Sequence, residues 1–220
     1  MSIADEKIPF EGVLLSVQAR SEVWRFRAKR RSHRVTGCNL FLNGKAGDKE
    51  GRFSIAVGEK NFLKTGAKAG DRIKGTVRRK LDPELEYAGF YRAASIRILE
   101  PGEESPSVVK KPAPFTGVPR CKRELDLRGA RMLDEELWKG KCFSCVFATM
   151  ANVHTTIGFD RFGSAVVKNG FEPFCYGPFN CPLYSMGMPR RVLSATGRAT
   201  DSGHLDWIST KCRPEDLDQN

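Results

Sequence analysis

Five segments in the first hundred residues alternate apolar and polar positions, which is the pattern of half-buried β-strands. They are rich in β-branched and aromatic residues, and Gly, Asn and Asp punctuate the chain between them at the spacing of small all-β folds. The segments cover residues 12–24, 35–42, 52–57, 71–79 and 93–99. The chain shows no internal repeat. The pattern predicts an α+β protein, mostly β, whose first half closes five strands into a barrel.

The chain between the third and fourth segments adds a second feature. It reads GEKNFLKTGAKAG, which is long enough for a short helix, and the fourth segment opens with Gly70-Asp71 and carries Gly75 inside the strand. Over about residues 8–99 this arrangement resembles the OB-fold, in pattern rather than in a diagnostic motif. The resemblance implies a helix that plugs one end of the barrel and glycines that allow sharp strand bends. It also implies that the loops joining strands one and two, and strands four and five, bind nucleic acid.

A proline-rich segment separates this half from the rest of the chain. Residues 100–120 hold five prolines, clustered charges and few bulky apolar side chains, a composition typical of an extended, poorly packed connector. The sequence therefore predicts a barrel domain at 8–99, a linker at 100–120, a cysteine-rich domain at 121–212 and a tail at 213–220. Because Gly, Pro and Cys dominate residues 171–189, we expect the second domain to be loop-rich and organised by a bound metal.

Charge is distributed unevenly along the chain. The formal net charge is +11, and residues 1–100 contain 21 Lys and Arg against 12 Asp and Glu. The remaining residues are nearly balanced. A basic field raises the local concentration of polyanions and favours binding to phosphate backbones. The first half is therefore the expected nucleic-acid-binding half.

The densest basic run lies at residues 24–34, in the loop expected between the first two strands. It has six Lys or Arg in eleven residues, and residues 80–92 would form the second loop with three aromatic and three acidic side chains. Guanidinium groups would neutralise phosphates while aromatic rings stack on unpaired bases. In the competing structural interpretation, the aromatic side chains fill the barrel and the arginines form a solvated hairpin tip. The candidate contacts are Trp24, Arg25, Arg27, Lys29, Arg30, Arg31, Arg34, Tyr87, Phe90 and Tyr91.

Four of the seven cysteines form two close pairs in the second half. Cys142 and Cys145 make a C-x2-C pair, and Cys175 and Cys181 make a wider C-x5-C pair 29 residues further on. Two thiolates from one turn, completed by a second pair, form the tetrahedral site of structural zinc modules. The sequence therefore predicts a four-cysteine zinc site, with Cys121 as a further or substitute ligand.

Two other features of this region leave alternatives open. Pro182 directly follows Cys181, and because Cys-Pro junctions occur in iron–sulfur ligation, a [4Fe–4S] cluster is the alternative to zinc. Apolar residues at 146, 147, 150 and 153 follow the C-x2-C pair with helical period, which predicts that the pair opens a helix. Such a placement also suits a thiol–disulfide redox pair.

The compartment and the function class follow from what the sequence lacks. Nothing after Met1 resembles an export signal, and no apolar run approaches the roughly 20 residues of a membrane span. We therefore expect a cytoplasmic protein without a membrane partner, in a reducing compartment where paired thiols hold metal. His33, His154 and His204 stand in no recognisable catalytic context, and phosphate-loop, dinucleotide and HExxH motifs are absent. Binding is therefore favoured over catalysis.

The leading hypothesis is a protein that binds RNA or single-stranded DNA and carries a structural four-cysteine zinc site. The alternative hypothesis is an iron–sulfur protein that acts in electron transfer or cluster assembly. In a third hypothesis the metal folds a small domain and the basic loop meets an acidic protein partner.

Overall fold

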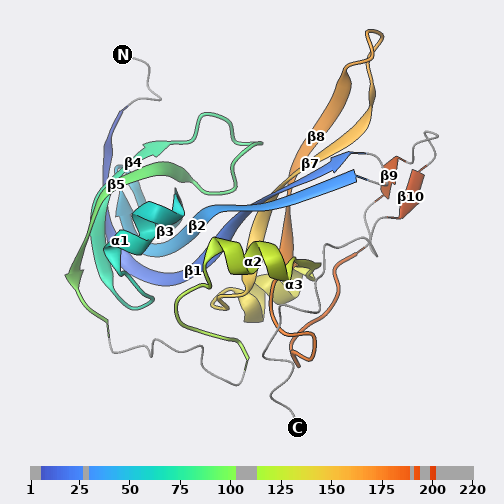
Figure 1. Ribbon diagram of the computed structural model, residues 1–220. Coiled ribbons are helices and arrows are strands. Elements are labelled where there is room, and N and C mark those ends of the chain that lie inside the picture. The colour runs from blue at the N-terminus through green and yellow to red at the C-terminus, as the bar shows by residue number, and fades with distance from the viewer. Residues whose placement is uncertain (1–5, 27–29, 103–112, 189–190, 194–198, 202–220) are drawn as a thin grey trace.

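The chain is built around one long β-hairpin (Figure 1). The computed structural model describes residues 6–26, 30–102, 113–188, 191–193 and 199–201, and most of these residues lie in strands. The hairpin consists of β1 (Ile8–Phe26) and β2 (Arg30–Ala46), paired in antiparallel register. It is followed by β3 (Lys49–Val57), α1 (Glu59–Thr65), β4 (Arg72–Arg79) and β5 (Phe90–Glu100). The five predicted strands and the short predicted helix are confirmed.

The start of β1 and the end of β2 close into a ring with the next three strands. β2 pairs with β3, and β4 pairs with both β1 and β5, all in antiparallel register. The ring closes through a parallel contact of Ile55 on β3 with Phe90 on β5. The strand order around the ring is β1-β2-β3-β5-β4. This is a closed ring of five strands, as the alternating pattern predicts.

The interior of the ring is apolar. Leucine, isoleucine, valine and phenylalanine side chains from all five strands fill it together with Phe62 of α1. Each fully buried side chain of this size stabilises the fold by about 1.5–3 kcal/mol. Close packing explains Gly75 on β4, because a Cβ atom there would lie 2.8 Å from the ring of Phe10. Gly12 and Gly44 oppose each other on β1 and β2, and a Cβ on Gly44 would lie 2.2 Å from a backbone oxygen of β1.

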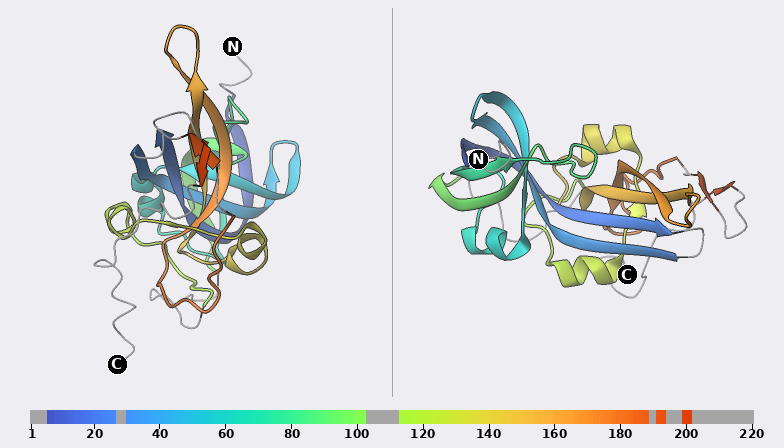
Figure 2. Two further views of the ribbon diagram at one scale, coloured as in Figure 1. Left: turned by 90° about the vertical axis from the view of Figure 1, so that its right-hand side faces the viewer. Right: turned by 90° about the horizontal axis from the view of Figure 1, so that it is seen from above.

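The far end of the β1–β2 hairpin leaves the ring and begins a second part of the sheet (Figure 2). β7 (Ala148–Phe159) runs parallel to β1, with Glu22 opposite Asn152 and Arg25 opposite Thr155. β8 (Ala165–Cys175) pairs with β7, and β6 (Arg131–Met132) pairs with the end of β8. One eight-stranded sheet therefore joins residues on both sides of the predicted linker.

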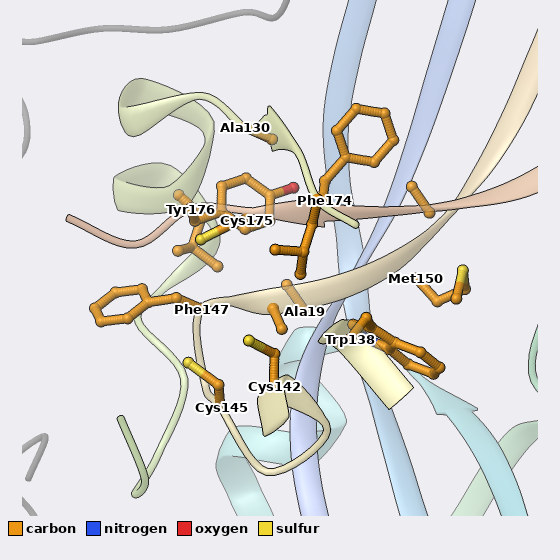
Figure 3. Packing of buried hydrophobic residues seen from close by; sticks show 14 of the residues in the cluster. Ala19, Ala130, Trp138, Cys142, Cys145, Phe147, Met150, Phe174, Cys175 and Tyr176 are labelled. Carbon is orange, nitrogen blue, oxygen red and sulfur yellow. The ribbon is translucent and has the colours of Figure 1, made fainter. Parts of the chain in front are cut away.

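A second core fills the space between this part of the sheet and the segments that cover it. Outward-facing residues of the hairpin, such as Phe41 and Val23, contribute to it, as do α2 (Lys122–Arg128) and the π-helical turn Trp138–Cys142. α3 (Glu135–Leu137) leads into that turn. Figure 3 shows Cys142, Cys145 and Cys175 among the buried residues of this core, which include Trp138, Phe147 and Phe174. β9 (Arg191–Leu193) and β10 (Ala199–Asp201) form a separate two-stranded sheet.

Two predictions about the second half are wrong. The apolar residues after Cys145 do not form a helix, because a tight turn at 145–148 leads directly into β7. β7 is buried without interruption from residue 148 to residue 154, and a strand buried on both faces gives a continuous apolar run that also fits a helical period. Two long strands occupy residues 148–175. Residues 176–188, which follow β8, contain neither helix nor strand, so among the described residues the loop-rich character expected of this half is found there and in shorter turns.

The described end of the predicted connector is packed rather than loose. Phe115 is buried in the second core, and its carbonyl accepts a hydrogen bond from the Val146 N–H at 2.8 Å. Residues 103–112 and the predicted tail at 213–220 lie outside the described residues. Within the described ranges, no helix has the length and apolar character needed to cross a membrane.

Candidate nucleic-acid interface and cysteine cluster

The predicted basic loop is largely the paired end of the β1–β2 hairpin. Phe26 of β1 lies opposite Arg30 of β2, so the arginines after residue 30 extend a strand. Arg27 and Lys29 lie outside the described residues, as do the side chains of Arg30 and Arg31. The structure therefore describes three of the predicted contacts in this run.

These three contacts are in different environments. Arg25 is buried, and its guanidinium donates two hydrogen bonds to the carboxylate of Glu172, at 2.8 and 2.7 Å. Trp24 is half-buried and stacks on His154, with 4.1 Å between ring centroids. Arg34 is exposed and pairs with a carboxylate on β1 at 3.2 Å. Arg25 is thus held in a structural ion pair, and we remove it from the candidate phosphate contacts.

The second predicted loop is also only partly available. Phe90 is buried inside the ring, edge to face with Phe53 at 6.0 Å, so it cannot stack on a base without leaving the core. Tyr91 is half-buried beside Arg92, whose guanidinium lies 5.4 Å from the ring centroid. Tyr87 is half-buried, and burial, followed by the nearby charge of Glu135, raises its pKa. Tyr87 is the best-placed aromatic residue of this loop.

A groove of about 780 Å3 opens beside Tyr87. β2 and β3 contribute Phe41 and Ser54 to its lining, the segment between β4 and β5 contributes Lys80 and Tyr87, and the π-helical turn contributes Trp138. The groove thus uses the second predicted loop. The basic hairpin end does not form the other wall of the groove. That wall is the π-helical turn, which begins more than fifty residues after Tyr87 in the sequence.

The charge of the groove is of one sign. Its lining includes five cationic side chains and no acidic one, namely Lys49, Arg52, Arg79, Lys80 and Lys139. Arg79 lies 3.6 Å from an exposed aspartate, and Lys139 lies 3.0 Å from two glutamates on α3. Lys49 and Arg52 are exposed and have no ion-pair partner among the described residues. Lys80 donates to the backbone carbonyl of Glu86 at 3.1 Å, so the groove cations without a described acidic partner lie on β3 and directly after β4.

Aromatic rings also line the groove. Phe41 contacts Phe143 at 4.8 Å and Trp138 at 6.2 Å, both edge to face, and Tyr87 contacts Trp138 at 6.0 Å. Edge-to-face contacts of this kind stabilise a fixed ring geometry by about 0.5–1.5 kcal/mol each beyond burial. Tyr87 and Phe143 are only half-buried, so part of each ring remains accessible from the groove.

Sequence reasoning placed Lys80 in the second loop but missed the other four groove cations, because they lie in three separate segments of the chain. They come from β3, the end of β4 and the π-helical turn, which are brought together only by the ring and its cover. Local signals are present on β3, where Lys49 and Arg52 precede the buried run that starts at Phe53, and at the end of β4, where Arg79 and Lys80 are adjacent.

No protein-family model, curated protein or solved structure matches this chain. What the chain does must therefore be inferred from the groove and from the cysteines beside it.

The four cysteines predicted as ligands line one small cavity. Cys142 ends the π-helical turn, Cys145 lies in the turn that follows, Cys175 ends β8, and Cys181 lies in the next turn. The β7–β8 register places Cys175 opposite Ala148, three residues beyond Cys145. All four line a cavity of about 10 Å3, and Figure 3 shows Cys142 and Cys145 side by side at the start of β7.

In the thiol form these side chains do not make a ready metal site. Within the part of the chain that the structure describes, no three His, Cys, Asp or Glu side chains are arranged so that they could hold one metal ion. Burial, followed by the charge of Cys175, raises the pKa of Cys142 to about 11 and that of Cys145 to about 12. Burial also raises the pKa of Cys181. Cys142 and Cys145 are therefore protonated at neutral pH unless a cation replaces their protons.

Two other described cysteines, Cys38 and Cys121, stand apart from this cavity. Cys121 is exposed at the start of α2 and does not line the cavity. Cys38 is buried in the ring interior, and burial raises its pKa to about 12. Cys212 lies outside the described residues. The structure thus separates Cys121 from the four cysteines that it brings together.

A buried amide connects the first cysteine pair to the ring. Gln18 on β1 is fully buried, and its Nε2 donates hydrogen bonds to the carbonyls of Cys142 at 3.2 Å and Phe143 at 2.7 Å. Its Oε1 accepts a hydrogen bond from the indole N–H of Trp138 at 3.2 Å. Trp138 and Phe143 line the groove, so the cysteine cluster and the groove wall share residues 138–145. We call this segment the 138–145 turn.

Proposed function

We propose that the chain binds single-stranded nucleic acid, RNA or DNA, in the groove beside Tyr87. The observation that carries the proposal is the lining itself, which combines five cations, no carboxylate and accessible aromatic rings around about 780 Å3. Cations along such a groove neutralise phosphates, and unpaired bases stack on aromatic side chains with about 1–3 kcal/mol per base. A duplex offers no free base face to the rings.

We also infer that the ring of five strands is an OB-like barrel. Its strand order β1-β2-β3-β5-β4, with a helix between β3 and β4, supports this assignment. OB-folds bind oligonucleotides on the face of their second and third strands, between flanking loops. The groove is lined by β2, β3 and the segment between β4 and β5, which agrees with that position.

The cationic and aromatic residues of the groove have different roles in this proposal. Lys49 and Arg52, which are exposed and without a described acidic partner, contact the phosphates. Tyr87 and Phe143 offer ring faces to the bases. Because stacking depends little on the identity of the base, binding is sequence-tolerant and strongly dependent on salt.

Charge reversal tests the proposal. The double variant Lys49→Glu, Arg52→Glu should weaken binding of labelled oligothymidylate and oligouridylate of about 12 nucleotides, a length within the range of one such fold. We expect a loss of about tenfold or more in affinity, and a salt slope lower by about one per phosphate contact removed. Fluorescence anisotropy over a salt series measures both quantities.

Two matched double variants identify where the strand binds. Lys60→Glu, Lys64→Glu reverses two charges on α1, away from the groove lining, and should bind as the unaltered chain does. Arg30→Glu, Arg31→Glu tests the hairpin end that the sequence favours. If this hairpin variant loses binding and the groove variant keeps it, the groove assignment is wrong. Loss of binding to the same extent in all three variants would indicate only a general effect of net charge.

A further inference from the structure

We propose that Cys142, Cys145, Cys175 and Cys181 bind one zinc ion, which fixes the 138–145 turn against the ring. This inference does not depend on nucleic-acid binding, because it concerns a different set of residues. It rests on the position of the four thiols, on the hydrogen bonds that their sulfur atoms accept, and on a buried guanidinium beside them.

The position of the thiols matches the size of one ion. Their cavity has a volume of about 10 Å3, which is about the room that one water-sized sphere needs. Zinc binds four cysteine sulfurs in a tetrahedron at about 2.3 Å. It imposes no geometric requirement on the protein other than this arrangement. Binding requires the four Sγ atoms to turn toward the centre of the cavity as they lose their protons.

Backbone N–H groups already point at three of the four sulfur atoms. The Gly177 N–H donates to Cys175 Sγ at 3.2 Å, and the N–H groups of Phe147 and Leu183 donate to Cys145 and Cys181. In each case the donor is two residues beyond the cysteine. Such hydrogen bonds orient a ligand in the way that supporting contacts do in metal sites.

Gly177 lies beside Cys175 and leaves space next to its sulfur atom. A Cβ atom on Gly177 would lie 3.2 Å from Cys175 Sγ and 3.4 Å from a side-chain carbon of Phe147. Any larger residue would therefore press on the sulfur atom of Cys175. The absence of a side chain at this position leaves Cys175 free to turn toward the cavity.

The buried guanidinium beside the cysteines belongs to Arg131. Arg131 is 5 % exposed, donates to the carbonyls of Pro178 at 2.6 Å and Phe179 at 3.3 Å, and lies 3.7 Å from the ring centroid of Tyr184. Its Nε atom is buried without a hydrogen-bond partner, and among the described residues no carboxylate pairs with it. Buried charges are normally paired, and the charge of Arg131 acts on Cys181. A zinc ion with four thiolates carries a net charge of −2, which one guanidinium offsets in part.

Metal analysis of the full chain tests the proposal directly. The protein, purified without oxygen, should contain about one zinc per chain, and titration of the metal-free protein with Co²⁺ should give the visible absorption of a tetrahedral tetrathiolate centre. Cys145→Ser should lower zinc affinity by more than the roughly 10- to 100-fold that loss of a supporting contact costs. Cys121→Ser is the matched control and should keep full affinity.

A second measurement needs no variant and so does not depend on the folding of Cys145→Ser. Zinc should protect Cys142, Cys145, Cys175 and Cys181 from alkylation, as located by peptide mass analysis, and should leave Cys121 reactive. Equal reactivity of all cysteines with and without zinc would overturn the proposal. About four irons with acid-labile sulfide in place of zinc would overturn the choice of metal. No oligonucleotide enters these assays, so a failure of the groove proposal leaves their outcome unchanged.

Discussion

The ring interior and the second core are both well packed, but they bury different kinds of groups. The ring interior is apolar and is filled by strand residues. The second core buries apolar side chains together with the Arg25–Glu172 pair, the amide of Gln18 and the guanidiniums of Arg128 and Arg131. Apolar burial is non-directional, whereas each buried polar group depends on particular partners. The ring should therefore tolerate changes in polar contacts, and the second core should not.

The connection between the two regions explains how both can form on one sheet. β1 and β2 run from the ring into the second core, so the ring presents a preformed outer face with Gln18 and Phe41 on it. The segments that cover this face come from residues 113–188 and carry the cysteines. We therefore expect changes in the second core to loosen first the segments of residues 113–188 that cover this face, which we call the cover. The backbone amides of the ring should stay protected from hydrogen exchange.

The largest expected effect is at the buried ion pair. Glu172→Gln removes the carboxylate that accepts two hydrogen bonds from Arg25, which is 6 % exposed, and leaves a buried guanidinium without its counter-charge. We expect the free energy of unfolding to fall by about 3–5 kcal/mol, as measured by urea denaturation. Hydrogen exchange should increase on β7, β8 and the far end of β1, and the ring amides should stay protected.

Glu22→Gln provides the matched control for this change. Glu22 pairs with Arg34, whose side chain is 66 % exposed, at 3.2 Å. Exposed pairs contribute about 0.2–1 kcal/mol, so this variant should be close to the unaltered chain. Equal destabilisation by the two substitutions, or loss of ring protection in Glu172→Gln, would contradict the comparison.

A pH effect of intermediate size is expected at His33. Its Nε2 is hydrogen-bonded to the hydroxyl of the buried Tyr176 at 2.5 Å, its Nδ1 is buried without a partner, and Asp126 and Lys122 face it. Burial is the largest cause that lowers its pKa, from 6.5 to about 4, while Asp126 acts in the opposite direction. The unfolded chain therefore takes up a proton on this residue at a higher pH than the folded chain does.

The sign of the effect follows from that difference. Above pH 6.5 His33 is neutral in both states and carries no penalty. Between pH 6.5 and about 4 the unfolded state gains the proton first, so the folded state loses up to about 3 kcal/mol as the pH falls. The difference in unfolding free energy between the unaltered chain and His33→Phe, measured from pH 7.5 to pH 4, isolates this contribution from that of the carboxylates. A difference that does not change with pH would show that His33 titrates normally.

The sequence predicted the ring better than it predicted its cover, for physical reasons. In the ring strands one face is buried and the other is not, so alternation such as that around Leu40 and Leu42 marks each strand locally. β7 is buried on both faces, and its run around Met150 therefore reads as a helix. The local density of charge predicted a binding site at the hairpin end, but Arg25 there pairs with a buried carboxylate. The groove cations come from separate segments of the sequence and are not marked by one dense run. The four cysteines line one cavity, and their role as ligands stays a prediction.

The smallest of these effects is expected where the two regions meet. Gln18→Met keeps the volume of the side chain but removes the amide, which leaves the Trp138 indole N–H and the Phe143 carbonyl without their buried partner. An unsatisfied buried group costs about 1–3 kcal/mol, and we expect a loss in that range. Because Gln18 faces the cover and not the ring interior, hydrogen exchange should increase in the 138–145 turn alone. Exchange that rises on β4 and β5 to the same extent would mean that the ring depends on its cover, since neither strand contributes to the second core.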